Sequence, residues 1–188
     1  NVMTMSPAKK DYGHHNYPLE RIEKAISWLK IHGNQKIGIV GASTTGTLAL
    51  TAASYFKDIT LTIGLTPSDF IWQGFMQGKR DGCKEWPMEG ESLFSYKEEP
   101  LPYMPFCYKH PDYWHVIEKE TKRTGDMINS RKLFDDSETA HPITEEEMIK
   151  IEKLQGTSLL IGAEDDVLWD TAKYIRRMKQ RVKDHPHT

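Results

Sequence analysis

The apolar residues of this chain recur in two patterns, one helical and one typical of buried strands. In the helical pattern, apolar residues follow one another at spacings of three and four, as Leu19, Ile22, Ala25, Ile26 and Leu29. This spacing predicts a helix over residues 18–29 with one buried face. Gly33 and Asn34 then predict its end.

Three short apolar runs, each flanked by turn residues, predict strands. They cover residues 36–40, 59–65 and 157–161, and such runs are typical of strands buried in a parallel sheet. Small residues over 47–56 predict a helix between the first two strands. The basic segment 170–182 predicts a helix after the third strand.

The segment between the second and third strands carries weaker patterns. Residues 70–112 are rich in Gly, Pro, Trp, Tyr and Phe without a steady period, so we predict a cap-like insertion over about 70–112. Residues 113–135 are charged and helical in pattern. Thr144, with Glu147 three residues later, fits a capping box and predicts a helix that ends at Gly156.

The order of these elements predicts an α/β fold. Strands linked through helices imply a parallel sheet with helices on both faces, a three-layer sandwich. A chain of 188 residues can bury such a core, and we expect a single domain over residues 1–188. Parallel sheets carry their chemistry at the carboxyl ends of the strands.

Composition narrows the classes of function. The formal net charge of −2 argues against a nucleic-acid partner, which would require a basic excess. No stretch approaches the ~18 apolar residues that would cross a membrane, and the first ten residues show no signal-peptide pattern. Cys83 and Cys107 lack CxxC spacing, so no metal site is predicted and a reduced, cytoplasmic protein is the simplest interpretation.

The strongest chemical signal lies between the first strand and the next helix, in the segment GASTTG at 41–46. A nucleophile elbow needs a Ser on a sharp strand-to-helix turn with small neighbours. Ser43 would be the nucleophile, and the N–H of Thr44 at the helix N-terminus would stabilise an oxyanion. The usual pattern is G-x-S-x-G, whereas here Thr45 stands at the last position and Gly46 follows.

Two other interpretations of this segment stay open. It could be a plain strand–turn–helix in which Ser43 only caps the helix. It could also be a dinucleotide-binding turn, since Gly38, Gly41 and Gly46 form a loose glycine-rich pattern, although G-x-G spacing is missing.

An acidic segment, 164–166, follows the third predicted strand. The carboxylate of a hydrolase triad belongs after a late strand and after the Ser in chain order. It would hold a catalytic imidazole in the correct tautomer. The alternative is a solvated acidic loop without a catalytic role.

Several segments together resemble one family, the C-terminal catalytic domain shared by acyl-CoA thioester hydrolases and bile acid-CoA:amino acid N-acyltransferases. Its shorter bacterial relatives are dienelactone-hydrolase-like. Besides the elbow and the first predicted helix, the matching segments are 66–74 (TPSDFIWQG), 95–97 (SYK), 101–106 (LPYMPF) and 165–169 (DDVLW). They run in family order over most of residues 18–182, and LPYMPF is the most specific of them.

The resemblance implies an α/β-hydrolase fold and a Ser, Asp and His triad that acts on acyl thioesters. Ser43 would be the nucleophile, and Asp166 would be the triad acid in preference to Asp165. Family acyltransferases that conjugate amino acids tend to use Cys at the elbow, so Ser43 favours hydrolysis through an acyl-enzyme. No metal or bound cofactor is implied, and coenzyme A would be part of the substrate.

The resemblance also implies elements that we expect to lie outside this sequence. In the family the catalytic His follows the acid after one more strand, whereas this sequence ends at Thr188. We therefore expect the His beyond Thr188, and we expect these residues to lack the first strands and the last strand of the fold.

Two other functions stay open. One is a carboxylic-ester or dienelactone-type hydrolase, because a fold alone does not choose the leaving group. The other is a non-catalytic α/β-hydrolase-like binding module, favoured by Thr45 and by the missing His.

The aromatic residues in and after the insertion also allow two interpretations. They would either line an acyl pocket or pack a core: Phe70, Trp72, Phe75, Trp86, Phe94, Tyr96, Tyr103, Phe106, Tyr108, Tyr113 and Trp114.

Overall fold

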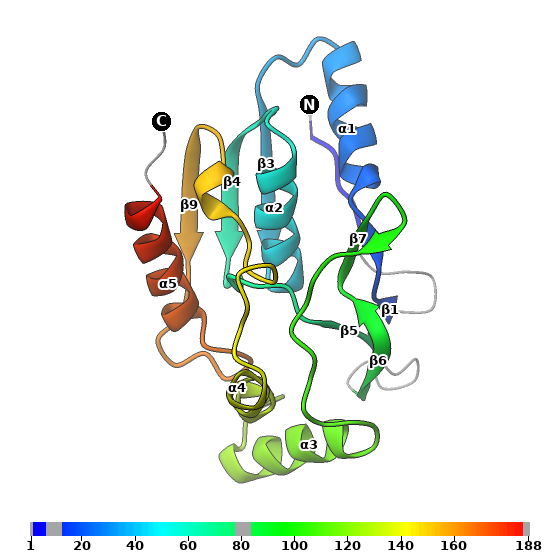
Figure 1. Ribbon diagram of the computed structural model, residues 1–188, viewed down its shortest axis with the longest axis vertical. Helices are drawn as coiled ribbons and strands as arrows, with labels where there is room; N and C mark the ends of the chain where they lie inside the picture. Colours follow the sequence, from blue (N-terminus) through cyan, green and yellow to red (C-terminus); the bar gives the residue numbers. More distant parts are fainter. Residues whose placement is uncertain (1, 7–12, 78–83, 186–188) are drawn as a thin grey trace.

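A three-stranded parallel sheet forms the centre of the structure. The computed structural model describes residues 2–6, 13–77 and 84–185. The strands pair in the order β3 (Ile37–Ala42), β4 (Ile59–Leu65) and β9 (Thr157–Ile161). The predicted parallel strands are confirmed, and β4 and β9 have the predicted bounds. Figure 1 shows β4 and β9 pointing toward the helix α4 (Arg131–Ala140).

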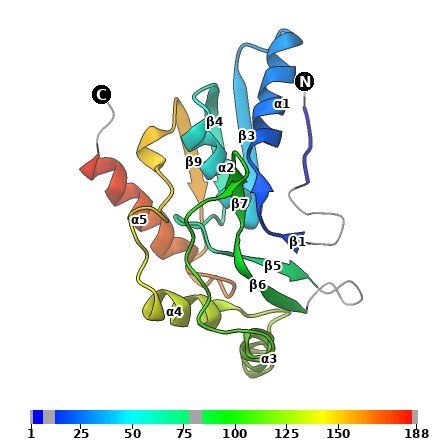
Figure 2. The same cartoon turned by 45° about the vertical axis from the view of Figure 1, so that its right-hand side comes forward.

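Three helices pack on one face of this sheet: α1 (Glu20–Ile31), α2 (Thr44–Tyr55) and α5 (Thr171–Asp184). Helix α2 contacts β3 and β4 and is buried over most of its length. Figures 1 and 2 show it lying beside these two strands. Leu160 of β9 and Ile175 of α5 line the same hollow. These three helices confirm the predictions, with ends shifted by a few residues.

The second face of the sheet is apolar, and no described helix covers it. Val40, Leu61, Leu159 and Ile161 project to this face by strand alternation and register, and they are 64%, 42%, 49% and 48% exposed. The strand order explains this. Because β3, β4 and β9 follow one another across the sheet, the right-handed connections between them run over the same face, where α2 packs. The described residues thus form two layers, whereas we expected three.

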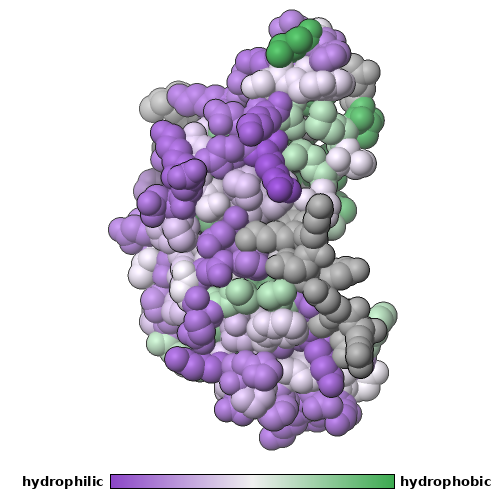
Figure 3. All heavy atoms as spheres, turned by 90° about the vertical axis from the view of Figure 1, so that its right-hand side faces the viewer, coloured by the Kyte–Doolittle hydropathy of each residue, from purple (hydrophilic) through white to green (hydrophobic). Residues whose placement is uncertain are grey.

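Two small sheets join the N-terminal segment to the predicted insertion. In sheet order their strands are β1 (Gly13–His14), β5 (Gln73–Gln77) and β6 (Glu85–Ser92), then β2 (Tyr17–Pro18), β7 (Phe94–Tyr96) and β8 (Glu99–Pro100). Figure 3 views this side of the molecule, where hydrophilic residues prevail and the most hydrophobic residues gather toward the upper end. Strands of two or three residues have no periodicity that a sequence could reveal.

Two helices precede β9. Helix α3 (Asp112–Thr124) ends at Gly125, whose φ of 79° suits only glycine well. Helix α4 follows, so the charged helical segment is two helices. The helix predicted from Thr144 to Gly156 is wrong, since the structure forms turns and the short 3-10 helix η1 (Ile151–Lys153).

Pairing with a distant segment replaces the predicted helix. The carboxylate of Glu147 accepts the N–H of Thr144 at 2.8 Å, as in a capping box. The following backbone groups then bond to the segment after β4. Ile71 N–H donates to the Glu147 carbonyl (3.1 Å), and Ile149 N–H donates to the Asp69 carbonyl (2.9 Å). These hydrogen bonds use a backbone carbonyl and a backbone N–H group that a helix would need for its own hydrogen bonds.

Four buried aromatic rings join the insertion, α4 and the loop after β9. Trp72, Phe106 and Trp169 surround Phe134, with ring centroids 5.3–5.4 Å from its own. Trp72 and Trp169 also contact each other at 5.2 Å. Core packing is therefore the role of Trp72 and Phe106, rather than an open pocket lining.

Candidate active site

Ser43 occupies a strained turn between β3 and α2. Its φ of 57° and ψ of −131° lie in a region that residues with a Cβ rarely adopt. The turn is tight, because a Cβ on Gly41 would lie 1.9 Å from the carbonyl oxygen of Thr45. A Ser at such a sharp strand-to-helix turn has the geometry of a nucleophile elbow.

The side chain of Ser43 does not cap α2. Ser43 is the N-cap residue, yet it makes no side-chain capping hydrogen bond. Its carbonyl oxygen accepts the N–H groups of Gly46 (2.8 Å) and Thr47 (3.1 Å). The N–H of Thr44 lies in the first turn of α2, where backbone N–H groups have no acceptor within the helix. The helix dipole also favours a negative charge at this end. The interpretation of Ser43 as a simple helix cap is therefore wrong.

Thr45, at the position of the usual glycine, fits this turn. Its hydroxyl accepts the N–H of Ala42 at 2.8 Å and donates to the Ala42 carbonyl at 2.6 Å. The close approach to β4 falls instead at Gly46, where a Cβ would lie 2.9 Å from the carbonyl oxygen of Leu65. The glycine is shifted by one position because residue 46 is the one that faces β4.

Asp166 lies in the loop after β9, residues 162–170, which we call the acid loop. One carboxylate oxygen accepts the N–H of Leu168 (3.0 Å), and the other accepts the hydroxyl of Thr171 (2.9 Å). Both donors are neutral and local. Asp166 is half-buried, whereas the neighbouring Asp165 is exposed.

Ser43 and Asp166 follow strands that end at the same edge of the sheet, with β4 between them. Ser43 N–H donates to the last residue of β4 (2.8 Å), and Thr66 N–H donates to the last residue of β9 (2.6 Å). The indole N–H of Trp169 donates to the Thr66 carbonyl at 3.1 Å, which holds the acid loop against this edge. The elbow and the acid loop thus lie where parallel sheets carry their chemistry.

No described histidine is a hydrogen-bond partner of the Asp166 carboxylate. His141 bonds to Glu147 at 2.7 Å, and His15 bonds to Glu91 at 2.5 Å. His185 lies exposed at the end of α5.

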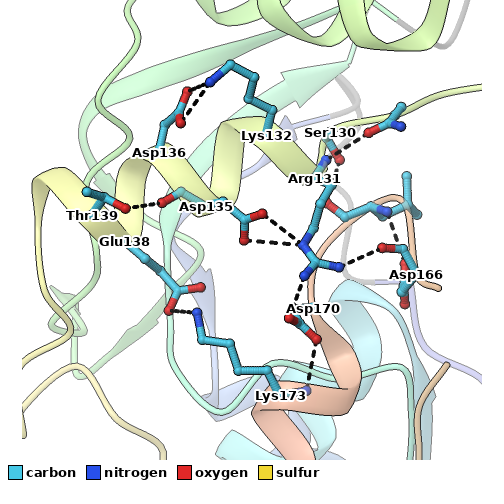
Figure 4. Close-up of polar contacts among 12 residues, drawn as sticks. Ser130, Arg131, Lys132, Asp135, Asp136, Glu138, Thr139, Asp166, Asp170 and Lys173 are labelled. Atoms are coloured by element: carbon cyan, nitrogen blue, oxygen red, sulfur yellow. Dashed lines mark hydrogen bonds and ion pairs between the residues drawn. The ribbon is translucent and has the colours of Figure 1, made fainter. Parts of the chain in front are cut away.

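Ser130 and Arg131, at the start of α4, hold the acid loop, and neither was predicted from the sequence. Figure 4 shows the guanidinium of Arg131 between Asp135, Asp166 and Asp170. No motif marks either residue, and the contact joins positions 35 apart in the chain. Only the packing of α4 against the loop reveals them.

Residues 17–188 match the family described as BAAT / acyl-CoA thioester hydrolase C terminal. The chain belongs to this family. The matched range includes both the elbow and the acid loop, and it confirms the resemblance that the sequence segments indicated.

A curated relative of this family member is mouse (Mus musculus) acyl-coenzyme A thioesterase 1, which is 24% identical over 170 residues. The alignment covers 89% of this chain and 33% of that relative. The chain therefore spans about a third of the length of the curated relative that it matches.

Two properties of this family member's described residues bear on its site. No helix among them is long and apolar enough to cross a membrane. Nor do three or more of their His, Cys, Asp and Glu side chains gather where a metal ion could be held. The residues at the carboxyl edge of the sheet that form the candidate site are Ser43, the N–H of Thr44 and the acid loop with Asp166.

Proposed function

We propose that this family member is a serine hydrolase that cleaves acyl thioesters through an acyl-enzyme on Ser43. The observation that carries the proposal is the backbone of Ser43, with its φ of 57° and a side chain that does not cap α2. Such a conformation costs about 1–3 kcal/mol and persists where the surrounding structure imposes it, often at functional sites. Ser43 also lies at the carboxyl edge of the sheet.

In the proposed reaction, Ser43 Oγ attacks the thioester carbonyl carbon while an imidazole takes its proton. The N–H of Thr44 donates to the oxyanion. The C–S bond then breaks, and the imidazolium returns the proton to the departing sulfur. Water, activated by the same imidazole, cleaves the acyl-enzyme and releases the acid and Ser43. Asp166 orients the imidazole.

We place the histidine that supplies this imidazole outside the described residues, because none of the described histidines bonds to the Asp166 carboxylate.

We also propose the α/β-hydrolase fold for the complete domain. A parallel sheet, an elbow after one strand and an acid loop two strands later support it. A third layer would cover the apolar second face of the sheet.

The proposed substrate class is acyl-CoA. The name of the family and that of the mouse relative support this choice. Coenzyme A would be the leaving group, with no metal or separate cofactor. Ser at the elbow favours water as the acceptor, because an oxyester acyl-enzyme is cleared by water more readily than it is passed to an amine.

Labelling with a fluorophosphonate tests the nucleophile in the full-length natural protein. The wild type and Ser158→Ala, which alters an exposed Ser on β9, should both be labelled. Ser43→Ala should not be labelled. If the wild type resists the reagent, the hydrolase proposal fails and a non-catalytic binding module is the better interpretation.

Turnover then tests the substrate class. The kcat/KM for acyl-CoA should exceed that for aryl esters of the same acyl group. The reverse order would assign the protein to the carboxylic-ester or dienelactone-type hydrolases instead.

A further inference from the structure

Three consecutive carbonyl groups of the acid loop accept hydrogen bonds from Ser130 and Arg131, the N-cap and the first residue of α4. The Val167 carbonyl accepts the backbone N–H groups of Ser130 (3.1 Å) and Arg131 (2.9 Å). The Leu168 carbonyl accepts the Ser130 hydroxyl at 2.9 Å. The Asp166 carbonyl accepts Arg131 Nη1 at 3.1 Å. Two adjacent residues thus hold the backbone of the acid loop.

The guanidinium of Arg131 extends these contacts to the start of α5. Its Nη2 donates to one oxygen of Asp170, whose other oxygen accepts the N–H of Lys173 at 2.9 Å and so caps α5. Its Nε donates to Asp135 of α4 at 3.0 Å. Only a planar group with five N–H donors can bridge these directions, and a lysine ammonium cannot reproduce the arrangement.

The hydrogen bonds of the Asp166 carboxylate come from residues close to it in the chain. Leu168 N–H and the Thr171 hydroxyl reach its carboxylate from within five residues, so they fix the carboxylate relative to the loop. They fix the carboxylate to the loop and to the first residue of α5, but they make no contact with α4. Within the described residues, the polar contacts of this loop with segments other than α5 are those of the Ser130–Arg131 pair and the bond between Trp169 and Thr66.

We propose that Arg131 is a positioning residue, which keeps the Asp166 carboxylate where it can orient the catalytic imidazole. This inference rests on the proposed function, in which Asp166 is the triad acid. A displacement of about 1 Å in such a group can lower the rate on the order of 100-fold. Arg131 itself does not touch the reacting atoms.

The test compares acyl-CoA turnover by the full-length protein and its variants. Arg131→Ala should lower kcat roughly 10- to 100-fold, with KM changed less than about threefold, and Arg131→Lys should recover only part of the loss. The acidic limb of the pH–rate profile should move to lower pH, because a displaced carboxylate stabilises the imidazolium less. Arg176→Ala is the matched control, since among the described residues Arg176 forms its ion pair with the exposed Glu164 of the same loop, at 3.3 Å.

A double-mutant cycle with Asp166→Asn separates positioning from a general structural role. If Arg131 acts through Asp166, Arg131→Ala should change kcat little in the Asp166→Asn background. An equal loss in both backgrounds, or an unmoved pH profile, would overturn the positioning role alone. If Asp166→Asn retains wild-type kcat, the proposed triad acid is itself wrong, and the positioning role fails with it.

Discussion

The backbone of Ser43 connects stability with function at the scale of a single residue. The family pattern indicated Ser43, but no pattern gives a dihedral angle. The φ of 57° follows from close packing on both sides of the turn. Gly41 lies against the backbone of α2, and Gly46 lies against β4, at distances that exclude a Cβ.

Replacing Ser43 by Gly should stabilise the protein while abolishing acylation. Glycine adopts a φ of 57° without strain, which stabilises the folded state, whereas its greater backbone freedom stabilises the unfolded chain. The net free energy of unfolding should rise by about 1 kcal/mol. Ser43→Ala keeps the Cβ and should change stability by less than about 0.5 kcal/mol. Urea denaturation measures both variants. Equal stabilities would show that the turn stores no strain.

At the scale of elements, Arg181 joins α5 to the segment 145–152, which precedes β9. Its side chain is nearly buried and donates to Glu152 (2.6 and 2.9 Å) and to Glu145 (2.9 and 2.6 Å). Hydrogen bonds from Arg181, followed by Lys150, lower the pKa of Glu145 to about 2. Hydrogen bonding to Arg181 likewise lowers the pKa of Glu152.

Arg181→Ala should destabilise the fold by about 2–3 kcal/mol at pH 7, because the largely buried Glu152 loses its partner. The difference in unfolding free energy between the wild type and Arg181→Ala should become smaller below about pH 4.5. There the unfolded chain binds protons at both glutamates, whereas folded Glu145 stays ionised to about pH 2. The stabilisation is therefore complete above pH 4.5 and declines as the pH falls.

Urea denaturation at pH 7 and pH 3 measures this difference. Arg176→Ala is the control, because its ion pair with Glu164 is exposed and should contribute less than about 0.5 kcal/mol at either pH. A loss for Arg181→Ala that is the same at both pH values would contradict the charge-based explanation.

The apolar second face of the sheet is the main feature at the scale of the whole molecule. Val40, Leu61, Leu159 and Ile161 form one surface across three strands. Exposed apolar patches of this kind, on a sheet whose outer strands are unpaired within the described residues, favour association.

Changing Leu159 and Ile161 together to Ser should reduce self-association of this chain and its binding of the dye ANS. Both side chains are about half exposed, so stability should fall by less than about 1 kcal/mol. Leu160→Ser, on the face that α5 covers, should cost roughly 1–3 kcal/mol. Sedimentation velocity and dye fluorescence check this. Unchanged association and dye binding would mean that the face is covered in solution.

The sequence alone determined the elements whose signal is local. Apolar spacing predicted α1, and short apolar runs predicted the three parallel strands, because a helix or strand repeats its buried face within a few residues. A segment of small residues predicted α2, and a basic segment after the third strand predicted α5. The order of the segments around the elbow and the acid loop likewise indicated the family, and the match over residues 17–188 confirmed it.

Only the tertiary structure decided the features that depend on partners far along the chain. The capping-box pattern at Thr144 became a turn because residues 69–71 take the backbone hydrogen bonds of that segment. Arg131 holds the acid loop through contacts that span 35 positions or more. The uncovered face follows from strand order. None of these three features has a local signal in the sequence. Each one depends on how segments that are far apart in the chain pair or pack with one another.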